Sequence, residues 1–70
     1  MRYLVVTERG ESSWGAHAPD LPGCIAVGET EEDVLRLISE AIDAHLELMQ
    51  QSGEPVPQPR MYPHLVEVAG

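Results

Sequence analysis

The stretch Asp20-Leu21-Pro22-Gly23-Cys24 separates two strand-like runs, so it marks the end of one predicted strand and the start of the next. Proline fixes φ and has no amide proton, whereas glycine reaches positive φ without strain, so together they interrupt regular structure. Two similar interruptions follow, Gly28-Glu29-Thr30 and the proline-rich stretch Gly53-Glu54-Pro55-Val56-Pro57-Gln58-Pro59. These three clusters divide the chain into a meander, one long helix and a short final segment.

Three short runs before residue 28 have the composition of β-strands. Residues 3–7 are β-branched and aromatic and are apolar on both faces, which predicts a central strand. Residues 14–18 alternate, so Trp14 and His17 are expected on opposite faces. Residues 24–27 form the third run, and the short connections between the runs predict an antiparallel meander.

A long amphipathic helix is predicted after the meander. The Thr30 hydroxyl can accept from the backbone N–H of Asp33 as an N-cap, and Gly53 is suited to the C′ position. Between them the helix covers about 20 residues. Apolar side chains recur at three- and four-residue spacing, which marks the face turned to the sheet: Val34, Leu35, Ile38, Ala41, Ile42, His45, Leu46 and Met49.

Residues 65–68 are expected to form a fourth strand. If this strand pairs parallel to the first, the helix is a right-handed crossover and the strand order is 3-2-1-4. Because Pro63 precedes the run, we expect either an edge position or a late start for this strand. The sequence therefore predicts an α+β fold, β-β-β-α-β with a mixed sheet and one long helix on one face, formed by a single domain over residues 1–70.

The net charge of −8 comes from 12 acidic residues against four arginines and no lysine. Such a surface repels nucleic acid and attracts basic proteins, although acidity can also serve solubility alone. No apolar run approaches the roughly 20 residues of a membrane span, no signal peptide is recognisable, and the single cysteine excludes an internal disulfide. We expect a cytoplasmic protein without membrane association.

Reactive residues are few. Cys24, His17 and Asp20 could form a nucleophilic site, but a cysteine that opens a short apolar strand is more often a small buried hydrophobe. The three histidines and Cys24 match no compact zinc pattern. Most carboxylates lie where capping and solvation place them. We therefore expect no enzyme activity, no cofactor and no metal site, and an enzyme that uses Cys24 or a carboxylate-bound metal is the alternative.

The sheet face away from the helix is the more informative feature. Apolar residues of the first strand left bare on that face would form a patch, and such patches usually meet another protein or a second copy of the chain. A homo-oligomer is therefore expected.

Three motifs in order resemble the HicB-type antitoxin family: residues 14–24, residues 28–32 ahead of the helix, and the Gly-Glu-Pro-Val-Pro stretch at residues 53–57. The resemblance covers roughly residues 2–59, and Val34 stands where the family commonly has alanine. It implies a truncated ribonuclease-H-like fold, which agrees with the predicted order of elements. Nuclease chemistry needs carboxylates that converge on metal ions, but the first strand offers Glu8 only at its end.

The resemblance also implies a function. HicB-type antitoxins block a small, basic, mRNA-cleaving toxin of the HicA type, which has a double-stranded-RNA-binding-domain-like fold. Many members carry a further DNA-binding domain, and because this chain stops at Gly70 we expect no direct nucleic-acid binding by it. A stand-alone homo-oligomeric interaction protein is the competing interpretation, and a hydrolase or nuclease is a weaker one. The candidate partner-binding residues lie near the helix start and in the meander: Glu29, Glu31, Glu32, Asp33, Trp14 and His17.

Overall fold

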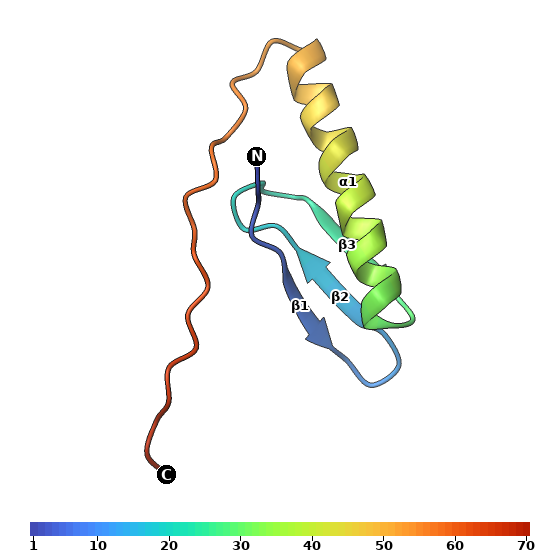
Figure 1. Cartoon of the computed structure of the whole chain (residues 1–70). Coiled ribbons are helices and arrows are strands. Elements are labelled where there is room, and N and C mark those ends of the chain that lie inside the picture. The colour runs from blue at the N-terminus through green and yellow to red at the C-terminus, as the bar shows by residue number, and fades with distance from the viewer.

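The structure, a computed structural model, describes all residues from 1 to 70. It contains three strands and one helix in the order β1 (Val6–Arg9), β2 (Trp14–His17), β3 (Ile25–Gly28) and α1 (Glu31–Gln51). Figure 1 shows α1 crossing one face of the sheet, and an extended segment, here called the tail (residues 54–70), running past the β1 side. The predicted α+β class is confirmed. The apolar length that a membrane-spanning helix requires is not present in α1.

The sheet is an antiparallel meander with the order β1-β2-β3. Thr7 pairs with Ala16, and Ala16 pairs with Ala26, so these three side chains share the face under α1. Val6, His17 and Ile25 pair in the same way on the opposite face, here called the outer face. The same alternation places the side chains of Trp14 and His17 on opposite faces of the sheet, as predicted.

The loop between β2 and β3 is closed by backbone hydrogen bonds. The Leu21 N–H donates to the Ala18 carbonyl at 2.9 Å and the Cys24 N–H donates to the Leu21 carbonyl at 3.0 Å. Gly23 has φ 83°, a conformation that glycine adopts without steric cost. The Pro-Gly cluster thus forms the tight turn that its composition predicted.

Both ends of α1 are capped as predicted. The Thr30 Oγ1 accepts from the backbone N–H of Asp33 at 3.0 Å. At the other end the Glu54 N–H donates to the Met49 carbonyl at 2.9 Å and the Gly53 N–H donates to the Gln50 carbonyl at 3.3 Å. With Gly53 at φ 75°, this is a Schellman motif. Local sequence chemistry therefore determines where α1 begins and ends.

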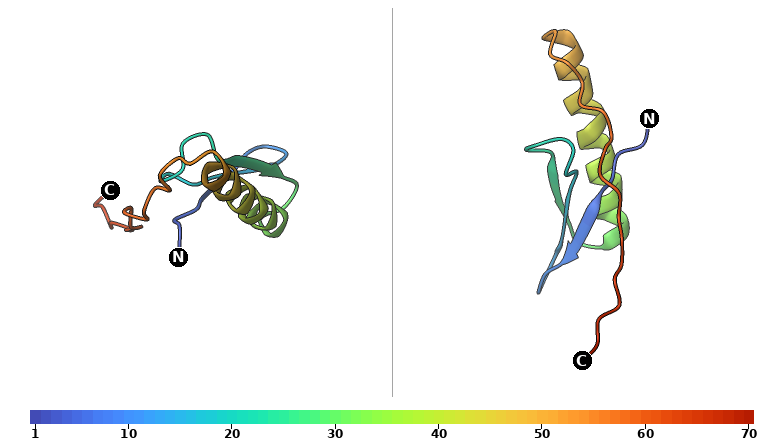
Figure 2. Two further views of the ribbon diagram at one scale, coloured as in Figure 1. Left: turned by 90° about the horizontal axis from the view of Figure 1, so that it is seen from above. Right: turned by 90° about the vertical axis from the view of Figure 1, so that its left-hand side faces the viewer.

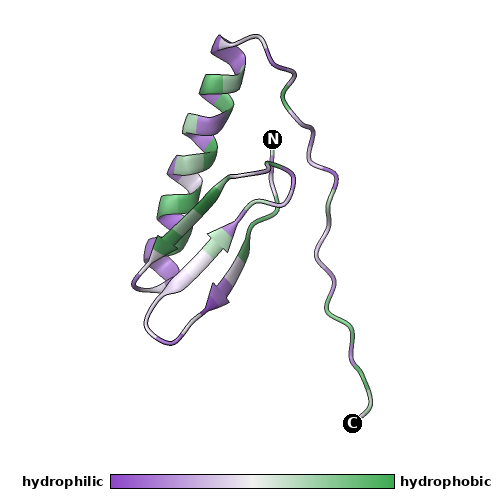
Figure 3. Ribbon diagram, turned by 180° about the vertical axis from the view of Figure 1, so that it is seen from behind, coloured by the Kyte–Doolittle hydropathy of each residue, from purple (hydrophilic) through white to green (hydrophobic).

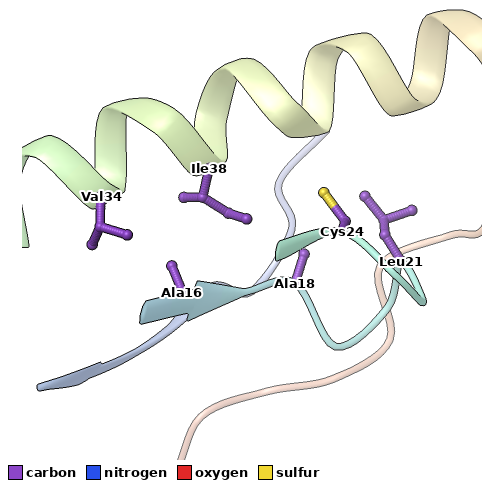
Figure 4. Close-up of a cluster of buried hydrophobic side chains, with 6 residues drawn as sticks. All are labelled: Ala16, Ala18, Leu21, Cys24, Val34 and Ile38. Carbon is purple, nitrogen blue, oxygen red and sulfur yellow. The ribbon is translucent and has the colours of Figure 1, made fainter. Parts of the chain in front are cut away.

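The core lies between α1 and the sheet and is small. Figure 4 shows Val34 and Ile38 pointing from α1 toward the side chains that rise from β2 and the β2–β3 loop. The six buried apolar residues are Ala16, Ala18, Leu21, Cys24, Val34 and Ile38. The far half of α1 extends beyond the sheet (Figure 1), and Leu48 there is exposed.

Three predictions need correction. Residues 65–68 form no strand, so the sheet is three-stranded and antiparallel throughout and the order 3-2-1-4 is wrong. Without that neighbour β1 is an edge strand instead of a central one, and it begins at Val6 rather than residue 3. Leu35, assigned to the buried face of the helix, is 45% exposed. The ribonuclease-H-like arrangement is not confirmed, because the predicted order of elements included a fourth strand that this structure does not contain.

Candidate partner-binding surface

Acidic side chains gather at one end of the molecule. The β1–β2 hairpin and the start of α1 lie at the same end in Figure 1. We call this region the acidic end, and its residues are Glu8, Glu11, Glu29, Glu31, Glu32 and Asp33. All of them are exposed except Asp33, which is half-buried. Six of the 12 carboxylates of the chain therefore concentrate on this part of the surface.

The first turn of α1 contributes three of the carboxylates at the acidic end. Glu31, Glu32 and Asp33 occupy the first turn of α1, where carboxylates offset the partial positive charge of the free backbone N–H groups. The Thr7 hydroxyl lies 3.3 Å from the Glu31 carboxylate and donates to it, which links β1 to α1. Glu29 and Glu32 have no hydrogen-bond partner within the chain. Their carboxylates are free to meet a cationic partner.

The outer face of the sheet adjoins the acidic end. Its side chains form two rows across the strands, Val6–His17–Ile25 and Glu8–Gly15–Val27. Ile25 and Val27 are 69% and 66% exposed, and in Figure 3, where the sheet is seen from behind, the β3 ribbon is strongly hydrophobic and the end of β1 is hydrophilic. Because Gly15 has no side chain, these rows border an open hollow of about 530 Å³. The predicted bare apolar face is therefore present, though β3 contributes more of it than β1.

The two meander candidates do not lie together. His17 is exposed on the outer face. Trp14 is on the other face, half-buried, and packs against the core under α1. The structure therefore places His17, but not Trp14, on the same face as the exposed apolar residues.

The residues of the hypothetical nucleophilic site are also apart. Cys24 is buried under α1, where burial raises the pKa of its thiol, and a raised pKa lowers the fraction of reactive thiolate. His17 points to the outer face. No three His, Cys, Asp or Glu side chains lie close enough together to hold a metal ion. The fold does not assemble the group of residues on which the enzyme hypothesis depended.

Asp20 has a role that sequence reasoning missed. Its carboxylate is buried, and Oδ2 accepts from the backbone N–H groups of Arg60 and Met61, each at 3.3 Å. The Tyr3 hydroxyl donates to the Pro57 carbonyl, a second attachment of the tail to the body. The sequence offered one signal, an acid beside a Pro-Gly turn, because a carboxylate buried there needs hydrogen-bond donors. The donors to Asp20 could not be identified, because they lie 40 residues away in the sequence.

Comparison with known proteins decides the family. A sequence profile described as the HicB-like antitoxin of bacterial toxin–antitoxin systems matches residues 3–68. The chain is a HicB-like antitoxin family member. A UPF0150 protein, Ta0767 of Thermoplasma acidophilum, is 34% identical to the HicB-like chain over 59 residues, which cover 83% of this chain and 86% of the relative.

Other relatives differ in length. The UPF0150 protein ssr1765 of Synechocystis is 38% identical, and the match covers 80% of the HicB-like chain and 72% of that protein. An uncharacterised 14.9 kDa protein of Haemophilus phage HP1 is 31% identical, and only 44% of its length is matched. The matched region therefore makes up most of the two UPF0150 proteins and less than half of the phage protein.

A solved structure shares the fold. It is a chain of a complex described as the HicA3 and HicB3 toxin–antitoxin complex, with a TM-score of 0.74 and 29% sequence identity. The match covers 89% of the HicB-like chain and 72% of the solved one. At this identity and coverage, the likeness agrees with the family assignment.

Proposed function

We propose that this chain is a cytoplasmic antitoxin that binds and neutralises a small, basic, mRNA-cleaving toxin of the HicA type. The observation that supports this most is the match over 89% of the chain to a component of a toxin–antitoxin complex. The net charge of −8 supports it independently, because an acidic protein is attracted to a cationic RNA-binding surface and repelled by RNA itself.

The proposed docking surface is the acidic end together with the adjoining outer face. Glu29 and Glu32 supply carboxylates without internal partners, and Ile25 and Val27 supply apolar area that is bare in the single chain. Interfaces of this kind combine an apolar centre with a polar rim. Charges on the rim chiefly accelerate encounter, while burial of the apolar centre slows dissociation.

Inhibition then needs no chemistry from this chain. A protein seated on the cationic surface of the toxin excludes RNA by occupying its binding site. Among the predicted partner residues, His17 and the acidic residues of the helix start belong to this surface, whereas Trp14 contributes by packing beneath it.

The test is an RNA-cleavage assay with a purified HicA-type toxin and increasing amounts of this chain. Glu29→Gln with Glu32→Gln removes two charges from the acidic end. The matched control, Asp43→Asn with Glu47→Gln, removes two charges from the exposed side of α1. We expect the wild type and the control to suppress cleavage at similar concentrations.

The acidic-end variant should need roughly three to ten times more protein for the same suppression, since exposed charge contacts contribute about 0.2–1 kcal/mol each. If both double variants suppress RNA cleavage equally poorly, the total charge of the chain, rather than the acidic end, determines binding. Unchanged cleavage with a large excess of wild-type chain contradicts the antitoxin proposal itself.

A further inference from the structure

Gly15 lies in the middle of β2, where the fold itself gives no reason for a glycine. Glycine weakens a strand interior, because it loses more backbone freedom on folding and packs no side chain. Gly15 is not among the glycines with positive φ, and no atom lies within 4 Å of the place where a Cβ would stand. Its pairing is continuous with both neighbouring strands, so it marks no bulge. The remaining common reason is the close approach of a group from another molecule.

The missing side chain leaves a gap between two unlike walls on the outer face. Glu8 of β1 and Val27 of β3 flank Gly15 in the same row. Because adjacent strands lie about 4.8 Å apart, these two residues are separated by roughly 10 Å. Figures 1 and 2 show that neither α1 nor the tail crosses this face of the sheet, and in Figure 3 the hydrophilic end of β1 and the hydrophobic β3 lie on either side of the pale β2. All three residues line the hollow of about 530 Å³.

The charge of Glu8 is not compensated within the chain. Its carboxylate makes no hydrogen bond and no ion pair, and no arginine or lysine is among the residues that line the hollow. A carboxylate opposite an aliphatic wall fits a side chain that has an apolar stem and a cationic head. Arginine fits better than lysine, because its guanidinium is more weakly hydrated than an ammonium group and can donate two parallel hydrogen bonds to one carboxylate.

We propose that the hollow above Gly15 receives one arginine side chain of the basic toxin. The aliphatic stem lies over Gly15 against Val27, and the guanidinium pairs with Glu8. This inference rests on the proposed function and adds to it the group of the partner that the outer face selects. Arginines seated in pockets at the centre of an interface are among the residues that contribute most to binding. Such an anchor would provide a specificity that attraction between net charges does not.

The experiment measures the dissociation constant of a purified HicA-type toxin by isothermal titration calorimetry. Gly15→Leu places a side chain in the hollow, and because nothing in the chain obstructs it, the melting temperature should not fall. We expect this variant to bind the toxin at least about thirtyfold more weakly. Glu8→Gln keeps the shape of the hollow and removes its charge, and it should weaken binding about tenfold.

Two matched controls separate the hollow from general properties of the surface. Ala44→Leu adds the same apolar side chain to the exposed side of α1, and Glu11→Gln removes a carboxylate of the acidic end that does not line the hollow. Both should bind within about threefold of the wild type. Because Gly15→Leu and Glu8→Gln act on the same arginine, the double variant should bind at most about threefold more weakly than Gly15→Leu alone.

The toxin provides the complementary test. When its arginines are replaced by lysine one at a time, one replacement should weaken binding to the wild type but not to Glu8→Gln. Neutral replacements throughout, or equal binding of wild type, Gly15→Leu and Glu8→Gln, overturn this inference and leave the proposed function intact. A wild type that does not bind toxin contradicts both. If Gly15→Leu binds toxin normally but loses self-association in sedimentation without toxin, a second copy occupies the hollow and the inference is wrong.

Discussion

At the scale of single residues, Gly28 determines how closely α1 approaches the sheet. A Cβ at this position would lie 2.8 Å from the backbone N and 3.1 Å from the Cα of Val34. Both are backbone atoms of a buried residue in α1 and cannot move aside by a rotamer change. The absence of a side chain at Gly28 therefore permits the chain to pass from β3 into α1 without a long loop.

We expect Gly28→Ala to lower the free energy of unfolding by about 1–3 kcal/mol, the usual cost of overpacking. This exceeds the roughly 0.4–1 kcal/mol that alanine gains by restricting the unfolded chain. Urea denaturation measures the difference. Gly15→Ala is the control, because no atom lies within 4 Å of a Cβ there and its stability should change by less than about 0.5 kcal/mol. Equal effects at both positions would contradict the close-approach argument.

Cys24 gives a prediction about pH. Because burial raises the pKa of its thiol above the ordinary 9.0, the folded state favours the neutral form more than the unfolded state does. Its contribution to stability is complete below the unfolded pKa and declines as the pH rises through and above it. We expect the melting temperature to fall more steeply above that pH in the wild type than in Cys24→Ala. Identical pH profiles would show that the thiol is not desolvated.

The residue scale also shows what the sequence can predict. Cys24 as a buried hydrophobe and Thr30 as an N-cap follow from local chemistry, and both are confirmed. The role of Asp20 could not be predicted, because its donors come from Arg60 and Met61 and the path of the tail decides whether they arrive. Trp14 could be assigned to a face, but periodicity does not tell which face α1 covers.

At the scale of elements, α1 was predictable and the fourth strand was not. The start of the helix, its end and its apolar face are determined by residues within a few positions of one another. A strand requires a partner as well as suitable residues, and β-propensity is largely a measure of packing against neighbours. Residues 65–68 meet the compositional requirement, but the attachments at Asp20 and Tyr3 direct them past β1. The fourth strand was wrongly predicted because strand pairing depends on tertiary structure, which local sequence does not determine.

The packing of α1 can be tested at Ile38, which is 1% exposed. We expect Ile38→Ala to cost about 2–5 kcal/mol through lost transfer energy and the cavity left behind. A domain of this size has roughly 4–10 kcal/mol of total stability at about 0.05–0.15 kcal/mol per residue, so the variant should be largely unfolded on warming. Leu35→Ala, at a 45% exposed position of the same helix, should cost much less. A thermal melt of each variant by circular dichroism distinguishes them, and similar losses would mean that the buried face is assigned wrongly.

At the scale of the whole molecule, a small core supports a strongly asymmetric surface. Only seven of 70 residues are buried, and small domains that bury so little are commonly stabilised by partners. Carboxylates concentrate at the acidic end, apolar residues on the outer face, and a neutral apolar segment in the tail. The acidic helix start and a bare apolar sheet face could be predicted from the sequence, but the apolar residues were assigned to the first strand and residues 65–68 to the sheet. The two-row arrangement of the outer face required the strand register.

The most direct test of the account is to map the toxin on this surface. Backbone amide chemical shifts of the labelled chain are followed while a HicA-type toxin is added. We predict that the largest changes fall on Glu29, Glu31 and Glu32 and on the outer-face residues His17 and Val27, and that added salt weakens the association. Changes confined to the exposed side of α1, or no binding at low salt, would contradict the account.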